Sequence, residues 1–388
     1  VANKLKIPVC EIKSDGNNLS GDFNLFEKSS NYVLPGEDHE ALVLHTSGTT
    51  SRPKIVPLTN KNIFSSADNI SKSLNLTDKD HCLNIMPLFH IHGLIAVLAA
   101  SMKVGASVCA SSGFNALKFL DNAKREKITW YSGVPTMHQA ILMRADKNLE
   151  TAKQLNLRFL RSSSASLPPA VFEKLNEVFN CPVIEAYGMT EATHQMTSNP
   201  LPPKSQKPGF VGIPAGPEVC IMDTNNKILN QGEEGEVCIR GENVTSGYEN
   251  NPDANKNSFS NGWFRTGDQG YFDKDGYLKI SGRLKEIINK GGEKISPLEV
   301  DNILMDHPNI EQAVCFGYED KMLGEDIATA IIIKEGMQCT EDDIKIYANE
   351  KLAKFKIPKK IFFVNEIPKG ATGKLQRNTL AKKFGLVN

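Results

Sequence analysis

The segment HTSGTTSRPK occupies residues 45–54 and follows the apolar run ALVL at residues 41–44. Its small residues and its closing Arg-Pro-Lys triplet offer hydroxyl groups, backbone N–H groups and a cation to one anionic ligand. A phosphate group is the anion that this pattern favours, because Gly48 lets the backbone approach the ligand closely. We therefore predict a phosphate-binding loop formed by Thr46, Ser47, Gly48, Thr49, Thr50 and Lys54.

This loop differs from the loop of the P-loop hydrolases, because the spacing G-x-x-x-x-G-K-[ST] is absent. An ordinary turn rich in Ser and Thr is the alternative interpretation of the segment taken alone. Segments elsewhere in the chain have to distinguish the two interpretations.

Three further motifs follow in the chain: YGMTEA at residues 187–192, WFRTGDQGY at residues 263–271 and PKGATGKLQR at residues 368–377. Together with the loop, and in this order, they resemble the adenylate-forming superfamily. That superfamily contains acyl-CoA synthetases, the adenylation domains of peptide synthetases and beetle luciferases. The resemblance extends over nearly the whole chain through the segments at residues 86–94, 161–169 and 281–301.

Within the superfamily, the chain is most similar to the oxalate–CoA ligase branch found in plants and fungi. The segments that carry this similarity are TSGTTSRPK, EAYGMTEATHQMTSNPLP and NKGGEKISPLEVD. Most of the superfamily has glycine where this chain has Ser51 and, usually, where it has Ile55. A serine adopts positive φ less readily than glycine, so the loop has to follow a more restricted path. The oxalate branch shares Ser51, whereas Ile55 stays unexplained.

Positive and negative side chains balance at 45 each, so the charge gives no case for binding nucleic acid or an anionic membrane. No stretch approaches the ~20 apolar residues of a membrane span. The eight cysteines occur singly, without the spacing of a zinc site or of a disulfide framework. A small-molecule enzyme of a reducing compartment fits these properties.

Neither a signal peptide nor a C-terminal peroxisomal signal is present in the sequence, so we expect a cytoplasmic protein, although relatives can be peroxisomal. The chain begins at Val1, about forty residues before the phosphate loop. The resemblance implies a longer preceding segment, and we therefore expect the chain to be N-terminally incomplete.

Strand-like and helix-like patterns alternate from residue 41 to about residue 190, which predicts parallel α/β layers. Strands are expected at residues 42–44, 82–86 and 107–110, and helices at residues 59–74 and 94–102. Thr59 is the predicted N-cap of the first helix. After residue 200, Pro, Gly and Asn turns separate short strands, of which the best are at residues 218–222, 235–240 and 277–280.

These patterns predict an α/β protein in three parts. Residues 1–207 form the layered α/β region of a large domain with the phosphate loop and the acyl pocket, and residues 208–284 form its β-rich subdomain. Residues 285–388 form a small, mobile α/β C-terminal domain. The resemblance places the hinge between the two domains at Lys285.

The resemblance implies activation of a carboxylic acid by ATP to an acyl-adenylate, followed by transfer to coenzyme A. Negative charge develops on the α-phosphate in the first step, and cations must lie where it grows. By position in the T-G-K segment, Lys374 is the catalytic lysine that the mobile domain brings to the site. Backbone without side chains lets the pantetheine arm pass closely, so the resemblance assigns coenzyme A binding to Lys290, Gly291 and Gly292; a tight turn is the alternative.

The nucleotide contacts are expected on a loop that follows a strand, at the carboxyl edge of a sheet. Tyr187 can stack on adenine, Thr190 can donate to the α-phosphate and Glu191 can hold Mg²⁺. Asp268 offers two acceptor oxygens to the ribose diol, and Arg283 is a second ribose or phosphate contact. The predicted ATP-binding segment also includes Glu185 and Ala186.

The segment after Glu191 is polar, at residues 192–197, whereas fatty-acyl ligases line this pocket with small or apolar residues. A dicarboxylate keeps a second negative charge inside the protein, which requires donors or a cation. By position in the oxalate branch, His194 and Ser164 can supply them, and His90 borders the acyl pocket; His92 is interpreted as structural. Oxalate is the preferred substrate. Malonate or another short- or medium-chain acid, and an inert nucleotide-binding fragment, stay open as alternatives.

Overall fold

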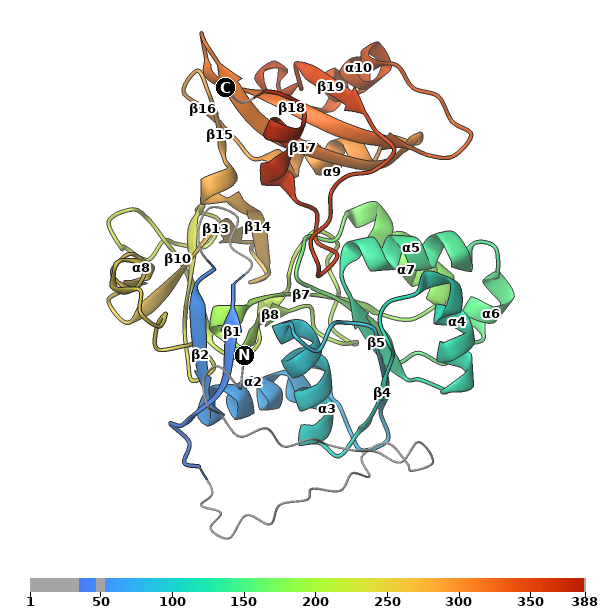
Figure 1. Ribbon diagram of the computed structural model, residues 1–388, viewed down its shortest axis with the longest axis vertical. Helices are drawn as coiled ribbons and strands as arrows, with labels where there is room; N and C mark the ends of the chain where they lie inside the picture. Colours follow the sequence, from blue (N-terminus) through green and yellow to red (C-terminus); the bar gives the residue numbers. More distant parts are fainter. Residues whose placement is uncertain (1–34, 47–52, 387–388) are drawn as a thin grey trace, which may run out of the picture. The chain divides into compact units, whose positions relative to one another are not determined.

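The computed structural model describes residues 35–46 and 53–386 (Figure 1). The chain divides into two compact units, residues 1–39 and residues 40–388, and every element below lies in the second unit. Within the described residues, none of the helices combines the length and the apolar character that a membrane crossing requires.

The first sheet is a two-stranded antiparallel hairpin of β1 (Glu40–His45) and β2 (Ile55–Thr59), seen side by side in Figure 1. Ser47, Gly48, Thr49 and Thr50, which the sequence predicts to bind phosphate, lie outside the described residues. The expectation that residues 42–44 belong to the parallel layers is wrong. β1 and β2 pair antiparallel, and only nine residues separate them in the sequence, whereas a parallel pair needs a crossover of a dozen or more residues.

The largest sheet has seven strands in the order β4-β3-β5-β6-β7-β8-β9. Its first five strands pair in parallel, as predicted, and the last three pair antiparallel. The strands are β3 (His81–Asn84), β4 (Ser107–Ala110), β5 (Trp130–Gly133), β6 (Phe159–Ser162), β7 (Val183–Met189), β8 (His194–Ser198) and β9 (Ile213–Pro214).

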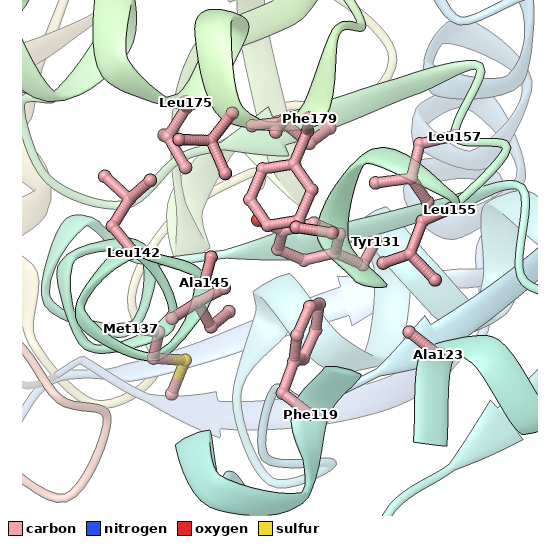
Figure 2. Packing of buried hydrophobic residues seen from close by; sticks show 14 of the residues in the cluster. Phe119, Ala123, Tyr131, Met137, Leu142, Ala145, Leu155, Leu157, Leu175 and Phe179 are labelled. Atoms are coloured by element: carbon pink, nitrogen blue, oxygen red, sulfur yellow. The ribbon is translucent and has the colours of Figure 1, made fainter. Parts of the chain in front are cut away.

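One face of this sheet packs against α4 (Ala116–Arg125), α5 (Pro135–Ala145), α6 (Leu149–Lys153) and α7 (Pro169–Phe179). Figure 2 shows Tyr131 of the sheet between side chains of these helices. Its ring centroid lies 4.8 Å from that of Phe119 and 6.3 Å from that of Phe179, both edge to face. Apolar burial of this kind holds the helices on the sheet.

The opposite face of the sheet packs against α2 (Asn60–Ser73) and the π-helix η1 (His92–Ala99), which continues into α3 (Ala100–Lys103). Thr59 caps α2 as predicted, because its hydroxyl accepts from the Asn62 N–H at 3.2 Å and the Asn62 side chain accepts from the Thr59 N–H. The predicted helix at residues 94–102 is confirmed and begins two residues earlier, at His92.

The β-rich sheet is antiparallel and contains β10 (Glu218–Met222), β11 (Gly235–Arg240), β12 (Phe259–Ser260), β13 (Trp263–Phe272) and β14 (Leu278–Arg283). The short helix α8 (Pro252–Ser258) precedes β12. The three strands expected from the sequence are thus confirmed. Successive residues are buried in β10 and β11, because Cys220, Met222, Cys238 and Trp263 form a small apolar cluster of their own.

The last sheet contains β15 (Ile288–Lys290), β16 (Glu293–Ile295), β17 (Ile310–Asp320), β18 (Gly324–Ile333) and β19 (Lys360–Phe363). Its helices are α9 (Pro297–Met305), α10 (Glu341–Lys351) and α11 (Leu380–Lys383); the short 3₁₀ turns of the chain are η2 (Thr190–Ala192), η3 (Leu284–Glu286), η4 (Lys354–Lys356) and η5 (Arg377–Thr379). The predicted α/β class is confirmed. The exact domain boundaries and the mobility of the C-terminal part stay predictions.

Candidate active site

Strand β7 carries the YGMTEA motif and runs further than the sequence suggests. Tyr187, Gly188 and Met189 continue the strand because β8 pairs with them antiparallel, beyond the residues that pair with β6. Gly188 is required there, since an added Cβ would lie 1.6 Å from the backbone oxygen of His194. The expectation that this motif begins on a loop is therefore wrong, and the strand itself holds the Tyr187 ring.

Tyr187, Asp268 and Arg283 come together from three strands. The Tyr187 hydroxyl donates to Oδ2 of Asp268 at 2.5 Å, and Nε of Arg283 donates to Oδ1 at 3.1 Å. Burial raises the pKa of the Asp268 carboxyl, which is 5% exposed, while the Arg283 guanidinium opposes this rise. The predicted adenine and ribose contacts thus form one hydrogen-bonded group, and each carboxylate oxygen keeps a lone pair for a ribose hydroxyl.

Glu191 lies in η2 and accepts at Oε1 from the Tyr248 hydroxyl, at 2.7 Å. The ammonium of Lys54 stands over the Tyr248 ring, 4.1 Å from its centroid. Burial lowers the pKa of Lys54, whereas the Glu191 carboxylate raises it. Tyr248 therefore connects two predicted ligand residues, and sequence reasoning missed it because one tyrosine in a β-rich region carries no local motif.

Hydrogen bonds also fix the backbone at Thr46, Lys54 and Thr190. The N–H of Thr46 donates to the Lys54 carbonyl at 2.9 Å, and the Thr46 hydroxyl accepts from the Lys54 N–H at 3.2 Å. Thr190 opens η2, and its carbonyl accepts from the Thr193 N–H at 3.0 Å. The two bonds between Thr46 and Lys54 hold the ends of the predicted phosphate loop together, whereas the Thr190 bond closes η2.

Lys374 lies in a tight turn at the end of the TGK segment. Gly373, with φ +81°, turns the chain, and its carbonyl accepts from the Thr136 hydroxyl at 2.8 Å, at the start of α5. Burial, with a contribution from the Arg283 guanidinium, lowers the pKa of Lys374 to about 8, while Asp268 and Glu191 act in the opposite direction. The lysine is therefore within electrostatic reach of the nucleotide group and of Glu191, as predicted for a lysine that serves the α-phosphate.

His90 is neutral at physiological pH. Burial lowers its pKa to about 4, and the Lys374 ammonium adds to the effect. Its Nδ1 accepts from the His92 backbone N–H at 3.2 Å, so the proton of the neutral ring resides on Nε2. His90 can therefore donate a hydrogen bond to a carboxylate.

The buried His92 and His194 and the half-buried Ser164 form a second polar group close to His90. The His92 ring bonds to the Ser164 hydroxyl through Nδ1, at 3.0 Å, and its centroid lies 5.0 Å from that of His194. Ser164 and His194 adopt positive φ, +74° and +96°. Such conformations are uncommon for residues other than glycine and concentrate at functional sites. The structure therefore brings the predicted acyl-pocket residues together.

Arg161 is a residue of this neighbourhood that sequence reasoning missed. Its side chain is 0% exposed, and Nη2 donates to Oε1 of Gln195 at 3.1 Å. The signal in the sequence was a basic residue inside the apolar strand pattern of β6, where a charge is costly.

Glu185 and Ala186 hold the loop that carries Ser164. Oε1 of Glu185 accepts from the Leu167 N–H at 2.9 Å, and the Ala186 carbonyl accepts from the Ser163 hydroxyl at 2.8 Å. Burial raises the pKa of Glu185 to about 8, so the carboxyl is mostly protonated at neutral pH. Direct ATP binding by these two residues stays a prediction.

Lys290, Gly291 and Gly292 form the turn between β15 and β16, and both glycines have positive φ. The Lys290 ammonium pairs with Oδ1 of the buried Asp326 at 2.5 Å. Lys285, the predicted hinge, lies in η3, and its ammonium helps to lower the pKa of Lys54. Coenzyme A binding and hinge motion stay predictions, as does the alternative of a simple turn.

Glu191 is the predicted Mg²⁺ ligand. No group of three or more His, Cys, Asp or Glu side chains within residues 35–46 and 53–386 is arranged to hold a metal ion. Oε2 of Glu191 accepts no hydrogen bond from this part of the chain, and a carboxylate oxygen is a ligand that Mg²⁺ prefers. The residues thus fit a Mg²⁺ that takes its other ligands from nucleotide phosphates and water.

Comparison with known proteins assigns two family profiles to the chain. The AMP-binding enzyme profile matches residues 3–249, and the profile of the AMP-binding enzyme C-terminal domain matches residues 299–374. The chain is 51% identical to an oxalate–CoA ligase of Arabidopsis thaliana, with 92% of this chain and 70% of the relative covered. It is 50% identical to that of Saccharomyces cerevisiae (89% and 63%) and 36% identical to a sulfoacetate–CoA ligase of Cupriavidus necator (96% and 73%).

Solved structures match over similar lengths. ATP-bound MatB from Rhodopseudomonas palustris has a TM-score of 0.85 and 30% identity, with 90% of this chain and 69% of that chain covered. O-succinylbenzoate coenzyme A synthetase from Bacillus subtilis, in complex with ATP and magnesium ion, has a TM-score of 0.79 and 32% identity (92% and 73%). The chain spans between 63% and 73% of the length of these relatives.

Proposed function

Because the chain belongs to the AMP-binding enzyme family, we propose that it is an acid–CoA ligase that activates a small dianionic acid, best represented by oxalate. The observation that carries this proposal is the position of Lys374, whose pKa responds to Arg283, Asp268 and Glu191. A basic group within electrostatic reach of both the ribose contacts and the predicted metal ligand suits the transfer of an adenylyl group. It does not by itself require any particular acid.

In the first step, a carboxylate oxygen of the acid attacks the α-phosphorus of ATP, and the bond from that phosphorus to the bridging oxygen of pyrophosphate breaks. The products are an acyl-adenylate and pyrophosphate. Lys374 and the Thr190 hydroxyl stabilise the charge on the α-phosphoryl oxygens, while Tyr187 and Asp268 position the nucleoside. Glu191 would hold Mg²⁺, which neutralises phosphate charge when it is bound.

In the second step, the thiol of coenzyme A attacks the acyl carbon and AMP leaves. Lys374 is no longer needed there, and rotation of the C-terminal part about Lys285 would bring the turn of Gly291 and Gly292 to the thiol path. The C-terminal part would thus serve the two half-reactions in turn. This use explains why it carries both the adenylating lysine and a turn with little side-chain bulk.

The choice of acid follows from the polarity of the acyl end and from the relatives. Oxalate and sulfoacetate, which name two of the relatives, each carry two anionic groups. Ser164, His194 and His90 supply polar groups at this end, where an alkyl chain would leave them unpaired. The acyl end therefore favours a short dianion over a fatty acid.

The test is a substrate panel on the purified full-length protein, followed by pyrophosphate release. We expect oxalate to be turned over best, malonate less well and medium-chain fatty acids least. Trapping with hydroxylamine should yield the hydroxamate of the acid before coenzyme A is added. Faster turnover of fatty acids would exclude the proposed acid. Calorimetric binding of ATP with Mg²⁺, but no trapped product from any acid, would identify an inert nucleotide-binding protein instead.

A further inference from the structure

Arg161 is a fully buried cation without an anionic partner among the described residues. It lies in β6 beside Ser132 of β5 and Ile184 of β7. Its printed hydrogen bonds go to neutral acceptors, Oε1 of Gln195 at 3.1 Å and Oγ of Ser132 at 3.5 Å, and its Nε has no partner in this part of the chain. Burial lowers its pKa to about 9, so the guanidinium keeps its charge at neutral pH.

The direction of the hydrogen bonds around Arg161 can be assigned from chemistry alone. A guanidinium only donates, so Ser132 accepts from it. The buried Ser132 hydroxyl has no other acceptor than His92 among the described residues, so its proton goes to Nε2 of His92, at 2.7 Å. Because Nε2 accepts, the proton of the neutral His92 ring resides on Nδ1 and is donated to the Ser164 hydroxyl. The Ser164 proton is then free to be donated to a ligand.

The Gln195 side chain fixes Arg161 from the other side. Nε2 of Gln195 donates to the Ser73 hydroxyl and to the Ala215 carbonyl, both at 3.0 Å, so its oxygen must face the guanidinium. The arginine is therefore held by an amide whose orientation is determined on both ends.

Nothing near this group supplies a compensating negative charge within the described residues. His92 and His194 are buried and have pKa values well below 6.5, first because of burial and then because of neighbouring histidine, Arg161 and Lys374. Neither ring nitrogen of His194 has a protein partner in the same part of the chain. Glu185 follows Ile184 in β7 and so points to the opposite face of the sheet, where it bonds to Leu167.

A buried charge normally requires a partner, because removal from water is otherwise too costly. A protein that retains such a charge beside unpartnered donors is prepared for an anion from solution. The acid of the proposed reaction has such a second anionic group. That group keeps its charge throughout adenylation, since only the other carboxylate reacts.

We infer that Arg161 is a positioning residue that makes the acyl end selective for acids with two negative charges. It acts through the hydrogen bonds from Arg161 to Ser132, from Ser132 to His92 and from His92 to Ser164. The positive charge polarises these bonds, so the Ser164 hydroxyl becomes a stronger donor to the carboxylate that is not adenylated. This inference rests on the proposed function and deepens it, because it makes the charge of one residue, Arg161, responsible for the preference for dianionic acids.

The test compares oxalate with oxamate, which has the same size but one negative charge, in wild type, Arg161→Met and Arg161→Lys. We expect R161M to lower kcat/KM for oxalate by about 100-fold, the order found when one partner of a buried charge pair is removed. The loss should fall on KM, because the distal carboxylate binds equally in the ground state and in the transition state. Oxamate should change by less than about threefold, and R161K should recover part of the oxalate activity.

Arg144→Met is the matched control, since Arg144 is an exposed arginine near the end of α5. It should leave the ratio of oxalate to oxamate unchanged. Calorimetry with ATP and circular dichroism establish that R161M is folded. If it is not folded, R161K and Ser132→Ala decide, because S132A interrupts the same relay and should lower the ratio.

Failure of the proposed function and failure of the role of Arg161 give different results in this test. A wild-type protein that adenylates no dianionic acid contradicts the proposed function. A wild type that prefers oxalate, with a folded R161M or S132A that keeps the same preference, overturns the role of Arg161 and leaves the proposed function intact. Equal losses for oxalate and oxamate would likewise overturn it, because they indicate a structural role.

Discussion

Two arginines, Arg161 in strand β6 and Arg377 in the 3₁₀ turn η5, are largely withdrawn from water, but only Arg377 has an anionic partner among the described residues. Arg377 follows the TGK segment, and its guanidinium bonds to Oδ2 of Asp301 at 2.6 Å, to Oε2 of Glu286 at 3.2 Å and to the Cys315 carbonyl. Arg161 bonds only to neutral acceptors. A matched charge holds its neighbours in place, whereas an unmatched charge is available to a ligand.

Lys290 and Lys374 show the same contrast between a cation with an anionic partner and a cation without one. Lys290 is paired with Asp326, which itself is 1% exposed. The carboxylates of Asp268 and Glu191 raise the pKa of Lys374, but neither forms an ion pair with it in the described structure. On this basis, the ion pairs of Arg377 and Lys290 are expected to stabilise the framework, and Arg161 and Lys374 are the cations proposed to act on ligands; coenzyme A binding by Lys290 stays a prediction.

The largest effect is expected on stability at Arg377. Arg377→Met leaves Asp301 buried without its cation, and we expect the free energy of unfolding to fall by about 3–5 kcal/mol. Arg161→Met strands no buried carboxylate and leaves only neutral acceptors, such as the Gln195 oxygen, without their donor, so it should cost less, about 1–3 kcal/mol. Urea unfolding followed by circular dichroism compares the two variants. If R161M is destabilised as much as R377M, the distinction between matched and unmatched charges is wrong.

The next effect is expected on catalysis at Lys374. Lys374→Ala should lower the rate of acyl-adenylate formation by roughly 100–1000-fold, as loss of a group that stabilises developing charge does. Binding of ATP, measured by calorimetry, should change far less. Lys369→Ala is the matched control, because Lys369 is exposed in the same turn. Undiminished hydroxamate formation by K374A would show that this lysine is not the adenylating group.

The charge of Lys374 also predicts a pH dependence. Its pKa is lowered to about 8, so the protonated form predominates below that pH and is lost above it. We expect kcat/KM for pyrophosphate exchange to fall about tenfold per pH unit above pH 8, as for one essential proton. In Lys374→Arg the guanidinium stays charged, so the fall in kcat/KM above pH 8 should disappear, even if the variant is slower at every pH. A wild-type profile that stays flat on both sides of pH 8 would contradict the assignment.

The smallest effect concerns Glu185, a buried acid without a cation. Its pKa is raised from 4.5 to about 8, so its contribution to stability is complete below pH 4.5 and is lost as the pH rises to 8. Glu185→Gln removes this loss and can still accept from the Leu167 N–H. We expect E185Q to be more stable than wild type at pH 8, with no gain at pH 4.5, by urea unfolding at both pH values. An equal difference at both pH values would exclude ionisation of Glu185 as the cause.

The elements that could be predicted are those with a local cause. The cap at Thr59 follows from a hydrogen-bonding side chain, and the strands of the β-rich sheet follow from short strand-favouring runs between Gly and Asn turns. Tyr187 and Asp268 were identified separately, each by its own motif, and the structure brings them into one hydrogen bond. Their roles toward ATP stay predictions.

The errors and omissions have a common physical origin in long-range pairing. β1 turned out to pair with β2, and β7 continues through Met189, because a partner strand supplied the hydrogen bonds. Tyr248 lies in no recognisable motif, and Arg161 opens the family-like segment at residues 161–169 without being assigned a role there. The contacts that single them out come from neighbours that are distant in the chain.

The residue order alone was sufficient for the α/β class, for the adenylate-forming resemblance and for the chemical groups of the nucleotide site, because motifs and periodic patterns are local properties. Which charges are matched is a different kind of property. It depends on which strands become neighbours and on how far water is excluded, so it is known only after the chain has folded. The unmatched guanidinium of Arg161 and the neutral tautomer of His92 are the two consequences that bear most on the acid this protein selects.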